Sequence, residues 1–196
     1  MSQNDSGQPL TAAIFPIEGV VFFPSLTLPL NIFEPRYLLM INDCLETGRP
    51  LAVTDLEPAP GVVAGVGQVQ LFEKRSDGTL VILVRGLHRA RILRIEQQTP
   101  YFTGILSPLE EATTVADEHR FFLQRLKSGM LEWADQALAD ADSRQAFMQG
   151  LTEGPDATRR LIETYAHFKI SDCDVRQQLL ETDTLESRLE LLRRLI

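Results

Sequence analysis

The chain has 196 residues, of which 44% are hydrophobic and 23% are charged. This composition is typical of a globular protein and excludes an extensively disordered one. The formal net charge is −8, and residues 1–110 and 111–196 are both acidic. Because contacts to phosphate dominate affinity for nucleic acids, this balance makes nucleic acid an unfavoured partner.

The sequence contains no pattern typical of a metal site, a cofactor site or a membrane-spanning segment. The two cysteines, Cys44 and Cys173, form no Cys-x-x-Cys pair that could hold zinc. Apolar runs such as Leu80–Val84 are too short to span a bilayer, and residues 1–9 contain no apolar signal segment. We therefore expect a cytoplasmic protein that needs no cofactor and does not enter a membrane.

Residues 10–110 predict a β-rich domain that follows a disordered lead-in at residues 1–9. Short apolar runs broken by prolines predict strands at residues 12–17, 20–23 and 28–32, and Pro29 suggests an edge or a bulge. A helix is predicted at residues 35–47, since Pro35 suits its first turn and Gly48 provides a left-handed stop.

Turn signals divide the rest of this region into further strands. Asp77 and Gly78 predict a hairpin between residues 62–76 and 79–85. The sequence Val84-Arg85-Gly86 predicts a break before an alternating strand at 87–97. Two more strands are predicted at 51–56 and 102–106. Many short strands separated by turns favour a closed or partly closed barrel.

Residues 111–196 predict a helical subdomain, with helical spacing from about Thr114 onwards. A second helix is expected to open at Pro155, and two short ones at Ser171/Asp174 and Asp183/Glu186. On the first helix the expected buried residues are Phe122, Leu126, Met130, Trp133 and Ala137. Because the strands precede the helices, we expect an α+β fold.

No pattern of a nucleotide-binding or hydrolytic site is present. The sequence contains no GxxxxGK[ST], GxGxxG, GxSxG or HExxH. Its histidines, His88, His119 and His167, lack the spacing of metal ligands. Neighbouring acids such as Asp140 and Asp142 are interpreted as solvated caps and loops. We therefore expect no catalytic residue and no metal ligand.

The most distinctive segment is LPLNIFEPRY at residues 28–37, preceded by IFPI at 14–17 and VFFP at 21–24. It resembles the start of the N-terminal, substrate-binding domain of Lon proteases. The strand VRGLHRARI at 84–92 and the helical tail extend the resemblance to about residues 11–196. The phosphate loop and the Ser–Lys dyad of full-length Lon proteases are missing, so the resemblance implies a stand-alone member without ATPase or protease activity.

The resemblance implies a PUA-like β-barrel with one inserted helix, followed by a helical subdomain that together recognise substrate proteins. Five residues at the centre of the motif are interpreted as structural: Phe33, Glu34, Pro35, Arg36 and Tyr37. In this interpretation Pro35 starts the helix, while Glu34 and Arg36 hold it against the barrel.

The expected partners are other proteins, bound through unfolded or extended segments. A binding groove is expected where the barrel meets the helices, because clefts favour domain interfaces. We expect Tyr101, Phe102 and Phe121 to line it, with Trp133 as a structural contact.

Two other functions stay open, together with the oligomeric state. One is an RNA-binding PUA-like module, which would use the basic cluster Arg85, Arg89, Arg91 and Arg94. No aromatic platform for stacking bases accompanies this cluster, so we interpret it as a solvated strand face. The other is a small hydrolase with an unrecognised site.

Overall fold

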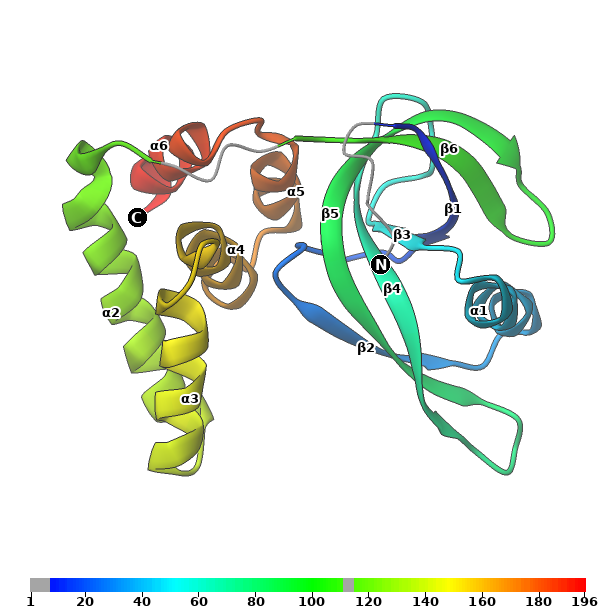
Figure 1. Cartoon of the computed structure of the whole chain (residues 1–196), viewed down its shortest axis with the longest axis horizontal. Coiled ribbons are helices and arrows are strands. Elements are labelled where there is room, and N and C mark those ends of the chain that lie inside the picture. Colours follow the sequence, from blue (N-terminus) through cyan, green and yellow to red (C-terminus); the bar gives the residue numbers. More distant parts are fainter. Residues whose placement is uncertain (1–7, 111–114) are drawn as a thin grey trace. The chain divides into compact units, whose positions relative to one another are not determined.

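A computed structural model describes residues 8–110 and 115–196, shown in Figure 1. The chain divides into two compact units, one ending at Glu110 and one beginning at Glu111. Six strands, with one helix inserted among them, precede the remaining helices, which confirms the α+β class. The disordered lead-in expected at residues 1–9 falls mostly on residues 1–7, which lie outside the described residues.

The first unit contains β1 (Leu10–Pro16), β2 (Thr27–Ile32), α1 (Pro35–Thr47), β3 (Leu51–Thr54), β4 (Val63–Lys74), β5 (Leu80–Gln97) and β6 (Phe102–Pro108). The second contains the short 3-10 helix η1 (Asp117–His119), α2 (Arg120–Ala137), α3 (Ala141–Thr152), α4 (Ala157–Lys169), α5 (Cys173–Glu181) and α6 (Leu185–Leu195).

The six strands form one sheet in the order β2-β5-β4-β3-β1-β6, and β5 pairs again with β6. The length of β5 allows this, because its first part pairs with β2 and its second part pairs with β6. The result is a ring-like sheet, visible in Figure 1, and not a fully closed barrel. β2 pairs only with β5 among the described strands, which agrees with the edge position suggested by Pro29.

The strand break expected at Val84-Arg85-Gly86 is wrong, since β5 runs through it without interruption. The register between β4 and β5 shifts here, where Val66 faces His88 but Gly67 already faces Gly86. This is a β-bulge, which bends a strand without ending it.

The strand expected at residues 20–23 is also wrong. Phe22 and Phe23 are buried, but they lie in an irregular segment between β1 and β2. A Cβ atom on Gly65 would overlap the carbonyl group of Phe22, and one on Gly86 would overlap that of Pro24. The segment therefore lies directly on the backbone of β4 and β5, at positions that only glycine can occupy.

The inserted helix α1 begins and ends as the sequence predicts. Pro35 occupies its first turn, and Gly48 closes it at a φ of 71°. Its buried residues Met40, Ile41 and Cys44 join the main apolar core of the first unit.

In the helical unit, the buried face of α2 consists of Phe122, Leu126, Met130 and Ala134. The expectation for Ala137 is wrong, because the four-residue spacing after Met130 selects Ala134 instead. Trp133 is half-buried, and its ring stacks on that of Phe168 with centroids 4.1 Å apart.

The helix α3 was not expected. It is capped by Asp140, whose side chain accepts a hydrogen bond from the Ser143 amide at 2.7 Å. Only Leu151 of this helix is buried, so no apolar stripe marks it in the sequence. The N-cap of α5 is Asp172, one residue after the expected Ser171. The N-cap of α6 is Thr184, one residue after the expected Asp183.

A buried ion pair joins α4 to α6. Glu163 and Arg188 are both 0% exposed, and Nη1 of the arginine lies 3.5 Å from Oε1 of the glutamate. The arginine Nε also donates to the carbonyl of Thr182 at 3.1 Å, in the turn before α6. Since a buried charge is costly without its partner, the pair fixes how these two helices pack.

We predict that Gly65→Ala lowers the free energy of unfolding by more than about 3 kcal/mol, because the new methyl group meets backbone rather than a side chain that can move. Urea unfolding followed by circular dichroism measures this. Gly78→Ala is the control, since it has the same chemistry at a φ of 88° but open space around it. It should cost only about 1–2 kcal/mol. Equal losses for the two variants would contradict the close approach of Phe22.

We predict that Arg188→Met alone destabilises the helical unit by about 3–5 kcal/mol, because it removes a buried cation that faces the buried Glu163 carboxylate. The double variant Glu163→Leu, Arg188→Met should recover most of this loss. The fluorescence of Trp133, the only tryptophan of the chain, follows unfolding of this unit. If the double variant is no more stable than Arg188→Met, the loss does not come from the buried charge of Glu163, and the prediction is contradicted.

Candidate functional site

The three residues expected to bind a partner have different surroundings. Tyr101 is buried, and its hydroxyl donates a hydrogen bond to the carboxylate of Asp43 on α1. Phe102 is half-buried against a second apolar cluster of the same unit. Phe121 belongs to the helical unit and is 90% exposed. Tyr101 therefore ties β6 to α1, Phe121 is open to solvent, and a groove shared by all three stays a prediction.

Burial favours the neutral form of four titratable side chains, those of Tyr101, Cys44, His88 and His167. Burial raises the pKa of Tyr101 to about 12, helped by the Asp43 carboxylate, and burial raises the pKa of Cys44 to about 11. Burial lowers the pKa of His88 and of His167. Within residues 8–110 and 115–196, no three His, Cys, Asp or Glu side chains gather as a metal site.

The four arginines of β5 do not form one solvated face. Arg89 is buried, which contradicts that interpretation for this residue. Arg91 donates to the Gly61 carbonyl at 3.1 Å, and Arg94 pairs with Glu96 at 3.0 Å. Arg85 is exposed. The cluster is thus divided between structural contacts and solvent.

The motif at residues 28–37 surrounds a hollow of about 390 Å³ in the first unit. The hollow is lined by the end of β1, the end of β2 and Tyr37 from α1. The Tyr37 ring packs on that of Phe15, with centroids 4.3 Å apart. At the rim lies Phe33, which is 67% exposed.

Glu34 and Arg36 do not hold α1 against a strand. They pair with each other at 3.0 Å on the surface, and the Arg36 guanidinium lies 4.5 Å from the centre of the Tyr37 ring. The motif therefore combines two roles. Pro35 and Tyr37 shape and pack the helix, whereas Phe33 is left facing solvent.

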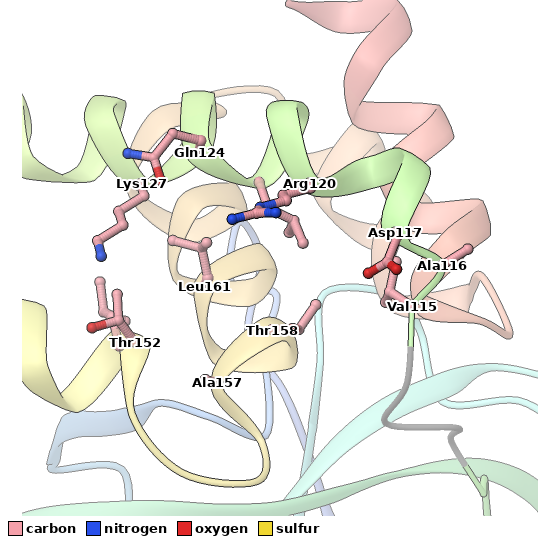
Figure 2. A pocket seen from close by; sticks show the side chains of 12 residues that line it. Val115, Ala116, Asp117, Arg120, Gln124, Lys127, Thr152, Ala157, Thr158 and Leu161 are labelled. Carbon is pink, nitrogen blue, oxygen red and sulfur yellow. The ribbon is translucent and has the colours of Figure 1, made fainter.

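A second concave surface, the α2–α4 groove, lies in the helical unit and has a volume of about 310 Å³ (Figure 2). It is lined by Val115, Ala116, Asp117, Arg120, Leu123, Gln124, Lys127, Leu151, Thr152, Ala157, Thr158 and Leu161. Leucines supply its apolar part. Figure 2 shows Arg120 and Lys127 reaching from α2 toward α4 and the end of α3, with Asp117 at the opposite end from Lys127.

The α2–α4 groove uses a different face of α2 from the one that is buried. Arg120, Leu123, Gln124 and Lys127 recur at intervals of three and four residues, so they share one side of the helix. A second hollow shares Asp117, Arg120 and Gln124 with this groove and is also lined by Phe121. Sequence reasoning missed this face because it followed the apolar spacing of Phe122 and its successors alone.

None of the helices in the described residues is both long and apolar enough to cross a membrane.

Comparison with models of known protein families identifies the family of this chain. The model of the ATP-dependent protease La (LON) substrate-binding domain matches residues 11–196. This chain belongs to that family. The match confirms the resemblance drawn from the sequence, and all the residues that line the hollow beside Phe33 lie within the matched range.

Solved structures of Lon N-terminal domains share the fold. A Lon N-terminal domain protein from Xanthomonas campestris has a TM-score of 0.71 at 24% identity, covering 94% of this chain and 97% of that one. The N-terminal domain of Mycobacterium avium complex Lon protease has a TM-score of 0.70 at 17% identity, covering 94% and 96%.

The curated relatives are much longer proteins. A Lon protease from Desulfovibrio desulfuricans is 28% identical over 193 residues, which is 93% of this chain and 22% of that protein. One from Haemophilus influenzae is 27% identical, over 93% of this chain and 23% of its own length. The present chain therefore spans less than a quarter of either relative.

We predict that Asp43→Asn lowers the pKa of Tyr101 from about 12, because it removes the carboxylate while burial remains. The folded pKa lies above the ordinary value of 10.0, so this tyrosine stabilises the fold fully below pH 10 and loses that contribution as the pH rises toward 12. Ultraviolet absorbance of tyrosinate measures the titration, and Tyr101→Phe identifies its component. An unchanged curve in Asp43→Asn would refute the contact.

Proposed function

We propose that this chain is a non-catalytic module that binds exposed apolar segments of other proteins through the hollow beside Phe33. The family description names a substrate-binding domain, and only that domain is matched here. The observation that carries the proposal is the 67% exposure of Phe33 at the rim of a hollow that the family motif builds.

Phe15, Phe22 and Phe23 of the first unit are buried, whereas Phe33 and Phe72 are 67% and 70% exposed. Of these two, Phe33 lines the hollow. Leaving a large apolar side chain in water forgoes about 1.5–3 kcal/mol of burial free energy. A bound apolar side chain could recover part of this by covering Phe33 and filling the hollow, whose walls include Leu30, Ile17 and other apolar groups.

The adjacent edge of β2 supports an extended ligand. Among the described strands β2 pairs only with β5, so its other edge offers backbone groups to an incoming strand. Pro29 removes one donor from β2, which limits such pairing to a short stretch. Because an unfolded segment must be ordered on binding, we expect affinities in the micromolar range at best.

The rival functions have less support. The basic cluster proposed for RNA is divided between burial, backbone contacts and an ion pair. No constellation of a nucleophile and a base was found in the sequence, and the matched family model describes a binding domain. We therefore propose that the chain holds its protein partner without cleaving it.

We predict that Phe33→Ser weakens binding of a permanently unfolded protein, fluorescently labelled carboxymethylated α-lactalbumin, by about fivefold to tenfold. Fluorescence anisotropy measures the dissociation constant. The matched control is Phe72→Ser, because Phe72 is 70% exposed but does not line the hollow. It should leave affinity within about twofold.

Equal losses in the two variants would mean that the surface is only generally adhesive, and unchanged binding in Phe33→Ser would place the site elsewhere. Both results would overturn the proposal. Thermal melting of each variant checks that an effect on binding is not an effect on folding.

A further inference from the structure

The α2–α4 groove contains two cations for which the described residues supply no partner. Neither the Arg120 nor the Lys127 side chain makes a hydrogen bond or ion pair with another residue in the described part of the chain. Other cations of the helical unit are engaged, such as Arg144 with Asp135 and Arg159 with Asp156. In a chain of net charge −8, the groove thus gathers two cations that are available to an acidic ligand.

We propose that the α2–α4 groove binds an extended protein segment that carries two acidic side chains with an apolar side chain between them. This interaction is separate from the one proposed at Phe33 and does not depend on it.

The apolar part of the α2–α4 groove defines the middle of the ligand. Leu151 and Leu161 are buried beneath it, and Leu123 flanks it from α2. A volume of about 310 Å³ accommodates a few side chains and not a folded element. A leucine-sized group can therefore lie between the two cations.

The spacing of the cations defines the spacing of the acids. Arg120 and Lys127 are seven residues apart on one helix, so their backbone positions are separated by about 10 Å. In an extended chain the side chains alternate between two faces and each residue rises about 3.3 Å. Acidic residues four positions apart therefore share a face with the residue midway between them and lie about 13 Å apart. Both cations have long side chains that can adjust to the exact position of each carboxylate.

The other charges around the groove leave it favourable to an acid. The first turn of α4, with Ala157 and Thr158, presents the positive end of a helix dipole to the groove. Asp156 before it is engaged with Arg159 at 3.2 Å. Among the described residues Asp117 is the acid that lines the groove, and the Glu186 carboxylate accepts a hydrogen bond from the amide of Ala116, which also lines it, at 3.0 Å. Figure 2 places Asp117 and Ala116 at the end away from Lys127. Both acids therefore lie at one end, and the Lys127 end keeps its positive charge.

The test uses the full chain, labelled with nitrogen-15, and the peptide Ser-Gly-Glu-Ala-Leu-Ala-Glu-Gly-Ser. Amide shifts should concentrate at residues 120–127 and 151–161, with a dissociation constant on the order of 100 µM. Replacing both glutamates of the peptide by glutamine should weaken binding by about fivefold or more. Added salt should also weaken it, because exposed charges are screened.

Arg120→Gln combined with Lys127→Gln should weaken binding by about fivefold or more. The matched control is Lys169→Gln combined with Arg194→Gln, which removes the same charge from exposed positions outside the groove. It should keep the affinity within about twofold. Phe33→Ser should likewise bind the peptide as the wild type does, which separates this result from the function proposed above.

Four results would overturn the proposal. Equal weakening by the control pair would reduce the effect to net charge. Amide shifts confined to residues outside α2, α3 and α4 would show that the peptide binds at another site. No amide shifts at millimolar peptide would show that the chain does not bind it. A single-stranded oligouridylate that shifts the same amides more strongly than the peptide would assign the groove to nucleic acid.

Discussion

The arrangement of the helical unit depends on two charges that are removed from water. Glu163 and Arg188 each carry a desolvation cost of several kcal/mol, which only the partner and further hydrogen bonds offset. α4 therefore cannot slide along α6 by a turn without separating these two buried charges. The same α4 supplies Thr158 and Leu161 to the α2–α4 groove, so an ion pair outside the groove fixes one of its walls.

In the strand unit the corresponding constraint is steric. The segment that connects β1 to β2 presses its carbonyl groups onto Gly65 and Gly86, where any side chain would collide. With this connection held in place, the end of β1 and the start of β2 are fixed relative to the ring of strands. The hollow beside Phe33 lies between these strands, so its shape follows from glycines that do not line it.

The elements with complete local signals could be predicted from the sequence, and the others could not. The bounds of α1 followed from Pro35 and Gly48, because both residues act through their own backbone conformation. α3 was missed because it buries little and so carries no apolar period. The bulge in β5 and the pairing of Glu163 with Arg188 arise between distant segments, and local spacing carries no information about either.

The candidate sites were predicted less well, because a binding surface is defined by what covers each side chain and what does not. Tyr101 and Phe33 are both aromatic residues beside apolar runs, yet one is buried against Asp43 and the other is exposed. Arg120 and Lys127 could be placed on one face of a helix from their spacing alone. That they lack ionic partners among the described residues is a property of the folded chain, since acids are abundant in the sequence around them. Unpaired charge beside apolar surface is therefore the signal that the sequence could not provide.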